Sequence, residues 1–145
     1  MRWPRWQVLL LAGASCFWGC QQQQVEGVTI NGTLTDQQDH STNQQMCQLI
    51  SRSLHHDNQA LAELVAFDCG GAARCYDLAD VITQILCRVG EPEFMRMTAT
   101  FSTQQQRDVR SFIEVGLEYG QHSVRKRRDN SISQQFPDLD RQLSK

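Results

Sequence analysis

The sequence predicts an all-α fold: a small helical bundle of four to five short helices, stapled by disulfides, with disordered N- and C-terminal tails. Between residues 41 and 122, apolar residues recur at helical spacing. Residues typical of helix starts and ends separate these stretches. The packed part is only about 80 residues and holds four cysteines, as expected where a core alone supplies limited stability.

The first twenty residues predict a signal peptide. Arg2 and Arg5 give a basic start, an apolar stretch runs from Val8 to Trp18, and the polar residues 21–24 end it. The stretch is too short for a transmembrane helix, which takes about 20 apolar residues. Residues 21–40 have few large apolar side chains, so we expect a polar linker with a short extended stretch at residues 28–30.

The cleavage region resembles the signal of a bacterial lipoprotein. Small residues precede both Cys16 and Cys20, so either cysteine is a candidate for lipidation. The alternative is ordinary signal-peptidase cleavage around residues 15–19. Both predict a protein that works outside the cytoplasm, anchored to a membrane only if it is lipidated.

Each of the first two expected helices begins at a candidate cap. Ser41 with Gln44 forms a capping-box pattern. Asp57 is a plausible cap for the second helix, which Gly70 and Gly71 end. The apolar residues at helical spacing in these two helices are Met46, Leu49, Ile50, Leu54, Leu61, Leu64 and Val65.

The third helix has the clearest pattern, and Gly90 and Pro92 stop it. At 100° per residue, Cys87 lies roughly opposite the apolar stripe. Cys87 therefore meets another element, another chain or nothing. The stripe consists of Leu78, Val81, Ile82, Ile85, Leu86 and Val89.

Two further helices complete the expected bundle. Pro92 at a first helical position starts a short fourth helix. Ser102 and Gln105 form a second capping box, and the fifth helix runs to Gly120 with Gly116 where a neighbouring backbone can approach closely. The apolar residues of these helices are Phe94, Met95, Met97, Val109, Phe112 and Ile113. Residues 123–145 are polar and predict a basic, disordered tail.

Four cysteines remain after signal removal: Cys47, Cys69, Cys75 and Cys87. In an exported domain they predict up to two disulfides. Cys75 and Cys87 lie on one expected helix, about 18 Å apart at 1.5 Å per residue, too far for a bond. The preferred pairing joins Cys69 to Cys75 across two glycines and leaves Cys47 for Cys87. The alternative joins Cys47 to Cys75 and Cys69 to Cys87. A Cys87 left over would allow a disulfide-linked dimer.

No motif for catalysis or phosphate binding appears, so we expect no enzyme and no cofactor. The cysteine spacings do not suit zinc. His55 and His56 are adjacent and point about 100° apart on a helix, so we interpret them as helix-end histidines rather than metal ligands. Glu114 and Glu118 fit a solvated helix face. The net charge of −2 argues against a nucleic-acid partner.

Two short motifs suggest modification. The basic run Arg125, Lys126, Arg127 and Arg128 resembles a dibasic, convertase-type processing site. Asn31 with Gly32 and Thr33 fits an N-glycosylation acceptor, which matters only in a eukaryotic host.

The function that this sequence predicts is an exported, disulfide-stabilised helical binding module with an unidentified protein partner. The first alternative is a secreted signalling precursor cleaved after the basic run 125–128. The second is a lipid-anchored periplasmic inhibitor or immunity-type lipoprotein.

Overall fold

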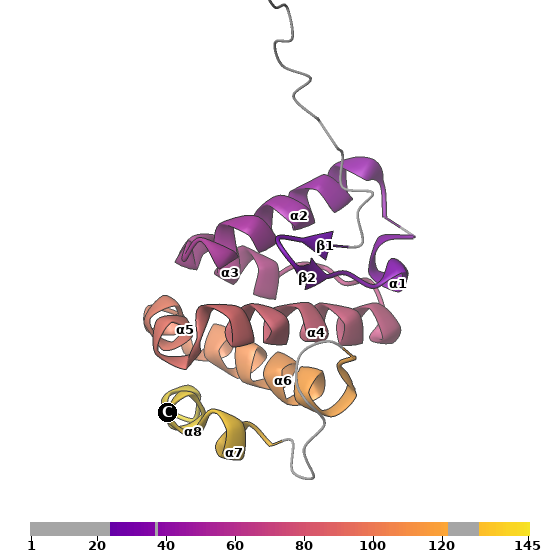
Figure 1. Ribbon diagram of the computed structural model, residues 1–145. Coiled ribbons are helices and arrows are strands. Elements are labelled where there is room, and N and C mark those ends of the chain that lie inside the picture. Colours follow the sequence, from indigo (N-terminus) through magenta and orange to yellow (C-terminus); the bar gives the residue numbers. More distant parts are fainter. Residues whose placement is uncertain (1–23, 37, 122–130) are drawn as a thin grey trace, which may run out of the picture.

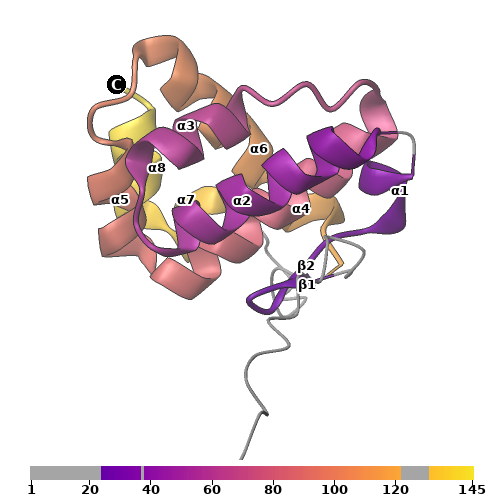
Figure 2. The same cartoon turned by 90° about the horizontal axis from the view of Figure 1, so that it is seen from above.

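The computed structural model describes residues 24–36, 38–121 and 131–145, and in these residues the predicted all-α class is confirmed. Helix α4 (Ala72–Val89) lies in the middle (Figure 1). On one side lie α2 (His40–Leu54) and α3 (Asn58–Val65). On the other side α6 (Thr103–Tyr119) packs along α4. Seen from above, α2 runs over α4, with a short hairpin beside it (Figure 2).

Helix α4 is buried on all sides in its middle. Every residue from Leu78 to Leu86 is buried. The expected apolar stripe explains only one face, because Asp80, Thr83 and Gln84 on the other faces are buried as well. A helix enclosed all round lies at the centre of a core rather than at its surface. The polar side chains on α4 therefore need partners inside the protein.

Of the caps predicted for the first two helices, one is confirmed and one is wrong. Asp57 caps α3 as predicted, because its carboxylate accepts a hydrogen bond from the Ala60 amide at 3.0 Å. Asp39, not Ser41, caps α2: its carboxylate accepts from both the amide and the hydroxyl of Thr42. A carboxylate is a stronger acceptor than a hydroxyl and is favoured by the helix dipole.

The fourth and fifth predicted helices are present as α5 (Glu91–Thr98) and α6. Pro92 lies in the first turn of α5, and Ser102 and Gln105 form both bonds of the capping box. Gly116 is buried where α6 crosses α4, as expected for a close backbone approach. These starts are set by residues within one turn of the helix end.

The segment expected to be a linker is part of the fold. It contains β1 (Gln24–Val25), β2 (Val28–Thr29) and α1 (Gly32–Thr35). The two strands are antiparallel, and Glu26 and Gly27 in the turn both have positive φ, as in the type I′ turns that suit hairpins. The expected extended stretch is therefore present, but its side chains enter the core: Val28, Ile30 and Leu34 are at most 2 % exposed.

The end of the expected disordered tail is also folded. Residues 131–145 form α7 (Ile132–Gln135) and α8 (Pro137–Leu143), which pack against α5 and α6. Ile132, Leu139 and Leu143 are buried. This part of the prediction is wrong, because three well-spaced apolar residues are enough when two neighbouring helices supply the rest of the interface.

Candidate interaction surface

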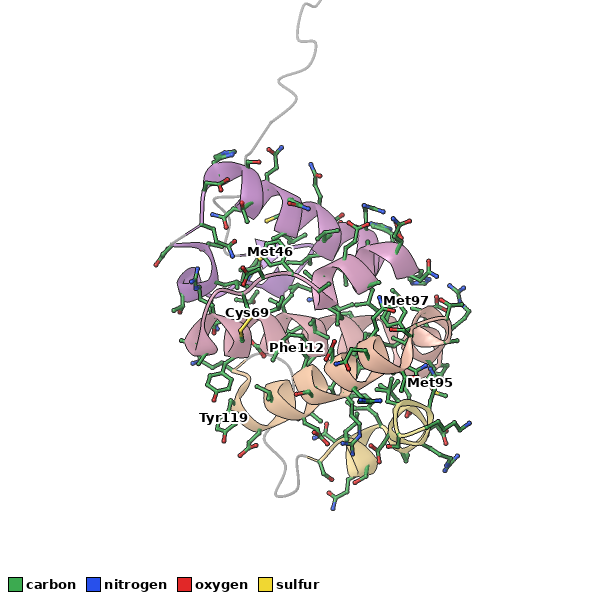
Figure 3. All side chains as sticks on the ribbon, turned by 180° about the vertical axis from the view of Figure 1, so that it is seen from behind. Met46, Cys69, Met95, Met97, Phe112 and Tyr119 are labelled. Atoms are coloured by element: carbon green, nitrogen blue, oxygen red, sulfur yellow. A yellow bond between two sulfur atoms is a disulfide. The ribbon has the colours of Figure 1, made fainter. Side chains whose placement is uncertain are left out.

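The two tyrosines of this chain form an exposed pair. Tyr76 near the start of α4 is 47 % exposed and Tyr119 at the end of α6 is 57 % exposed, and among the described residues they are the large hydrophobic side chains left exposed. Their ring centroids are 5.3 Å apart, in the range of a favourable aromatic contact. Figure 3 shows Tyr119 at the outer edge of the molecule. We call these two residues the tyrosine pair.

Two structural features hold the tyrosine pair in place. The Cys69–Cys75 disulfide closes the loop before Tyr76 and fixes the first turn of α4. One turn inward, Gly116 of α6 lies against Ala79 of α4, so the two helices approach closely beside the pair. Because both tyrosines sit within one turn of this crossing, their separation depends on how the helices pack.

The phenol of Tyr119 is kept protonated. A hydrogen bond to the Glu118 carboxylate, together with its negative charge, raises the pKa of Tyr119 above its usual value. The pair presents apolar ring surface together with hydroxyl groups, a combination enriched at protein interfaces. Glu118 and Glu114 are exposed along the same helix, as the sequence predicted.

The cysteines follow the preferred pairing only in part. Cys69 and Cys75 are bonded, with Cα atoms 5.1 Å apart. The expected Cys47–Cys87 bond is wrong: Cys47 is disulfide-bonded, but Cys87 retains its thiol on the exposed side of α4. Burial of the sulfur, and then the charge of Asp80, raise the pKa of the Cys87 thiol, which weakens it as a nucleophile. A dimer through Cys87 stays a prediction.

The remaining predicted modification sites fall into two groups. The Asn31 side-chain amide donates a hydrogen bond of 2.7 Å to the Asp77 carboxylate, so the nitrogen that a glycan would modify joins α1 to α4. The other candidates lie outside the described residues: Cys16 and Cys20 for lipidation, and Arg125, Lys126, Arg127 and Arg128 for processing.

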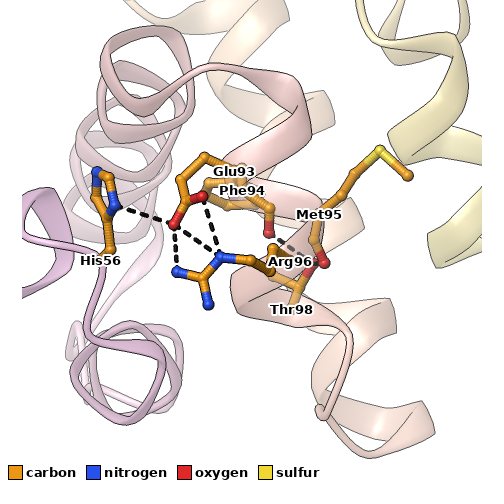
Figure 4. Close-up of polar contacts among 6 residues, drawn as sticks. All are labelled: His56, Glu93, Phe94, Met95, Arg96 and Thr98. Carbon is orange, nitrogen blue, oxygen red and sulfur yellow. Dashed lines mark hydrogen bonds and ion pairs between the residues drawn. The ribbon is translucent and has the colours of Figure 1, made fainter.

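The two adjacent histidines face different carboxylates. His56 has φ +68°, a left-handed conformation that is uncommon outside glycine. Its Nδ1 lies 3.0 Å from Glu93 of α5, whereas His55 Nε2 lies 3.0 Å from Glu26 in the hairpin turn. Figure 4 shows Glu93 between His56 and Arg96. The histidines thus link the α2–α3 connection to two other elements instead of meeting at one metal.

The surroundings of Glu93 predict that the stability of the protein depends on pH. Hydrogen bonds from Arg96, and then the positive charges of Arg96 and His56, lower the pKa of Glu93 below its ordinary value of 4.5. A lowered folded-state pKa contributes stability above 4.5 that is lost as the pH falls through the folded-state value. We therefore expect Glu93→Gln to lower the urea midpoint at pH 7 and to match wild type at pH 2. Exposed Glu63→Gln is the control, and equal wild-type and Glu93→Gln midpoints at pH 7 would contradict this.

A polar clamp on α4 was missed by the sequence analysis. The amide of Gln84 pairs with both backbone groups of Thr29 in β2: Oε1 accepts from Thr29 N and Nε2 donates to Thr29 O, each at 2.9 Å. One turn further, Arg88 donates to the carbonyl of Gly27 at 2.7 Å. The Gln84 amide thus bonds to β2 in the way that a neighbouring strand would. The signal in the sequence was a glutamine next to the apolar stripe of the third expected helix.

The described residues contain neither a candidate metal site nor a candidate membrane-spanning helix. Within them, no three His, Cys, Asp or Glu side chains gather as metal ligands. Likewise, none of their helices combines the length and apolar character of a membrane span. No protein-family model matches this chain, and no curated protein or solved structure is significantly similar to it.

Proposed function

We propose that the protein is an exported binding module that contacts a protein partner through the tyrosine pair. The observation that carries this proposal is that Tyr76 and Tyr119 are both about half exposed and lie against each other. Tyrosines are enriched among the residues that dominate binding energy, because they bury much area and lose little conformational freedom. Exposed apolar side chains that lie side by side mark interaction sites more often than scattered single residues do.

Export is supported by the sequence of residues 1–20 and by the chemistry of the cysteines. The Cys69–Cys75 disulfide is of a kind that persists in oxidising compartments and is rare in the cytosol. N-terminal sequencing and intact mass of the protein from its native host test this step. A mature chain that begins near residue 20, with or without a lipid, supports export; a chain that retains Met1 in the cytosol refutes it.

The binding step is tested by replacing Tyr119 with a photoreactive phenylalanine analogue in the exported protein. The same analogue at Arg107, exposed on α6, is the control. The cross-linked partner is identified by mass spectrometry, purified and titrated against the unlabelled protein. We expect the double variant Tyr76→Ala, Tyr119→Ala to raise Kd at least about 10-fold, since hot-spot tyrosines each contribute more than about 1 kcal/mol.

Arg107→Ala is expected to leave Kd within about twofold, as is usual for surface residues outside an interface. About half of each tyrosine side chain is buried, so the urea midpoint of the double variant is measured alongside Kd, and Kd is compared only where the variant is folded. An unchanged Kd for the double tyrosine variant, in a folded protein, would reject the tyrosine pair as the interaction surface.

A further inference from the structure

The last fifteen residues are bound to the rest of the protein in the way a ligand is bound. Residues 131–145, here the C-terminal segment, contact α5 and α6. They touch the face that carries Glu91, Met95, Thr98 and Arg110, here the α5–α6 face. In Figure 4 the side chain of Met95 points away from His56 and Glu93, toward the pale yellow ribbon of the C-terminal segment.

Helix α8 receives its N-cap from a different helix. The Glu91 carboxylate accepts hydrogen bonds from the backbone amides of Asp138 and Leu139, at 3.0 and 2.9 Å. Helix α8 has no side-chain cap of its own, unlike α2, α3 and α6, which each carry one. The unsatisfied amides of the first turn are thus satisfied by a residue 47 positions away.

Side-chain pairs then fix the position of α8 along the face. Two nitrogens of the Arg110 guanidinium lie 3.0 Å from the same carboxylate oxygen of Asp140. The Gln142 amide donates to the Met95 carbonyl at 3.0 Å and to the Thr98 hydroxyl at 3.1 Å. These groups recognise a helix of one direction and one register, because the contacts are spread along α8 from Asp138 to Gln142.

The apolar contacts follow the same register. Leu139 is fully buried and Leu143, one helical turn later, is 3 % exposed. An isolated helix of seven residues is unstable in water, so α8 is ordered by the face it covers. Apolar anchors one turn apart, flanked by specific polar pairs, are the pattern of helix recognition by a protein surface.

We propose that the α5–α6 face is a recognition site for a short amphipathic helix with a carboxylate in its first turn, and that the C-terminal segment occupies it in cis. Because the contacts above come from residues 131–145 alone, the segment stays bound when the chain is cut at the basic run 125–128. Processing there yields a two-chain, non-covalent protein rather than a free peptide. This site uses none of the residues of the tyrosine pair and is independent of the proposed function.

The test uses the full chain with a site-specific protease sequence in place of residues 125–128. After cutting, a fluorescent peptide of residues 131–145 is added and its anisotropy is measured. We expect the labelled peptide to exchange into the cut protein, to be displaced by unlabelled peptide, and to bind the uncut protein at least about 10-fold less well, because tethering gives the internal segment a high effective concentration.

Peptide variants test the register without changing the fold of the rest. Leu139→Ala in the peptide should weaken binding at least about 30-fold and Asp140→Ala about 10-fold. Gln134→Ala, at an exposed position, should change Kd less than about twofold. In the protein, Glu91→Ala should weaken binding about 10-fold, whereas Glu93→Ala in the same turn of α5 should leave it within about twofold.

Three results would overturn the inference. The first is a folded, cut protein that does not bind the peptide at millimolar concentration. The second is loss of the helical circular dichroism after cutting with no recovery when peptide is added. The third is peptide binding that is insensitive to both Leu139→Ala and Glu91→Ala.

Discussion

Gly116→Ala is expected to lower the free energy of unfolding by about 1–3 kcal/mol, and Gly116→Val by more, because an added side chain overpacks the α4–α6 crossing. A Cβ at this position would lie 2.5 Å from the carbonyl oxygen of Ala79 and closer still to the hydroxyl of Thr83. The hydroxyl can rotate, but the carbonyl belongs to a buried helix and cannot. The clash therefore exceeds the roughly 1 kcal/mol that alanine gains over glycine in a helix.

Urea unfolding of the variants measures the effect. Gly32→Ala is the matched control, because its Cβ would meet the Asp36 side chain at an ordinary 3.5 Å. Adding Thr83→Ala to Gly116→Ala should restore only part of the stability, since the Ala79 carbonyl stays in place. A Gly116→Ala protein as stable as wild type would mean that the two helices are further apart than described.

The same substitution should alter the spectroscopic signal of the tyrosine pair. Tyr76 and Tyr119 lie within one turn of the crossing and are the tyrosines of the whole chain. If the expected signal peptide is removed, the three tryptophans at positions 3, 6 and 18 are removed with it. Near-UV circular dichroism of the mature protein then reports this pair without tryptophan, and Gly116→Val should reduce the signal.

The sequence predicts well what depends on neighbouring residues. Asp57 and Ser102 were expected as caps because a cap and its amide lie within three residues of each other. The Cys69–Cys75 bond was preferred because two glycines make the intervening loop flexible. Helix α4 was expected from one apolar stripe. In the first two cases the interaction that stabilises the element lies within the element or beside it, whereas the apolar stripe identifies only one of the buried faces of α4.

The errors concern segments that are stabilised from far away in the chain. Val28 and Leu34 are isolated apolar residues among polar ones, and their burial requires α4, which begins only at Ala72. Leu139 likewise depends on Glu91 for its backbone partner. From their composition these segments are predicted to be exposed to solvent, because local composition holds no information on packing partners from distant parts of the chain.

The Cys47–Cys87 error has a different cause. The pairing was reached by elimination, which assumes that every cysteine left after signal removal pairs with another of the four. The helical position of Cys87, opposite the apolar stripe, pointed outward instead, and the structure places Cys87 on that exposed side. The tyrosine pair was missed because helical periodicity identifies buried residues, and exposed aromatic residues leave no periodic signal.

Gln84→Leu is expected to lower the free energy of unfolding by about 2–3 kcal/mol, which is a large loss for one side chain. Leucine keeps most of the volume but cannot replace either hydrogen bond to Thr29. Loss of both partners leaves the backbone N–H and C=O of Thr29 poorly satisfied beneath the hairpin. Amide hydrogen exchange at Thr29 should accelerate more than exchange in α6, and Gln48→Leu, at an exposed position on α2, is the control.

Gln84→Glu separates the hydrogen bonds from the packing. A carboxylate can still accept from Thr29 N, but it cannot donate to Thr29 O and it lies beside the buried Asp80. Burial and like charge both disfavour the ionised form, so the folded state favours a protonated glutamate that can donate again. The stability deficit of Gln84→Glu relative to wild type should therefore shrink as the pH falls from 7 toward 5, whereas that of Gln84→Leu should stay constant. Equal and pH-independent deficits would mean that Gln84 holds the hairpin by its shape and not by its amide.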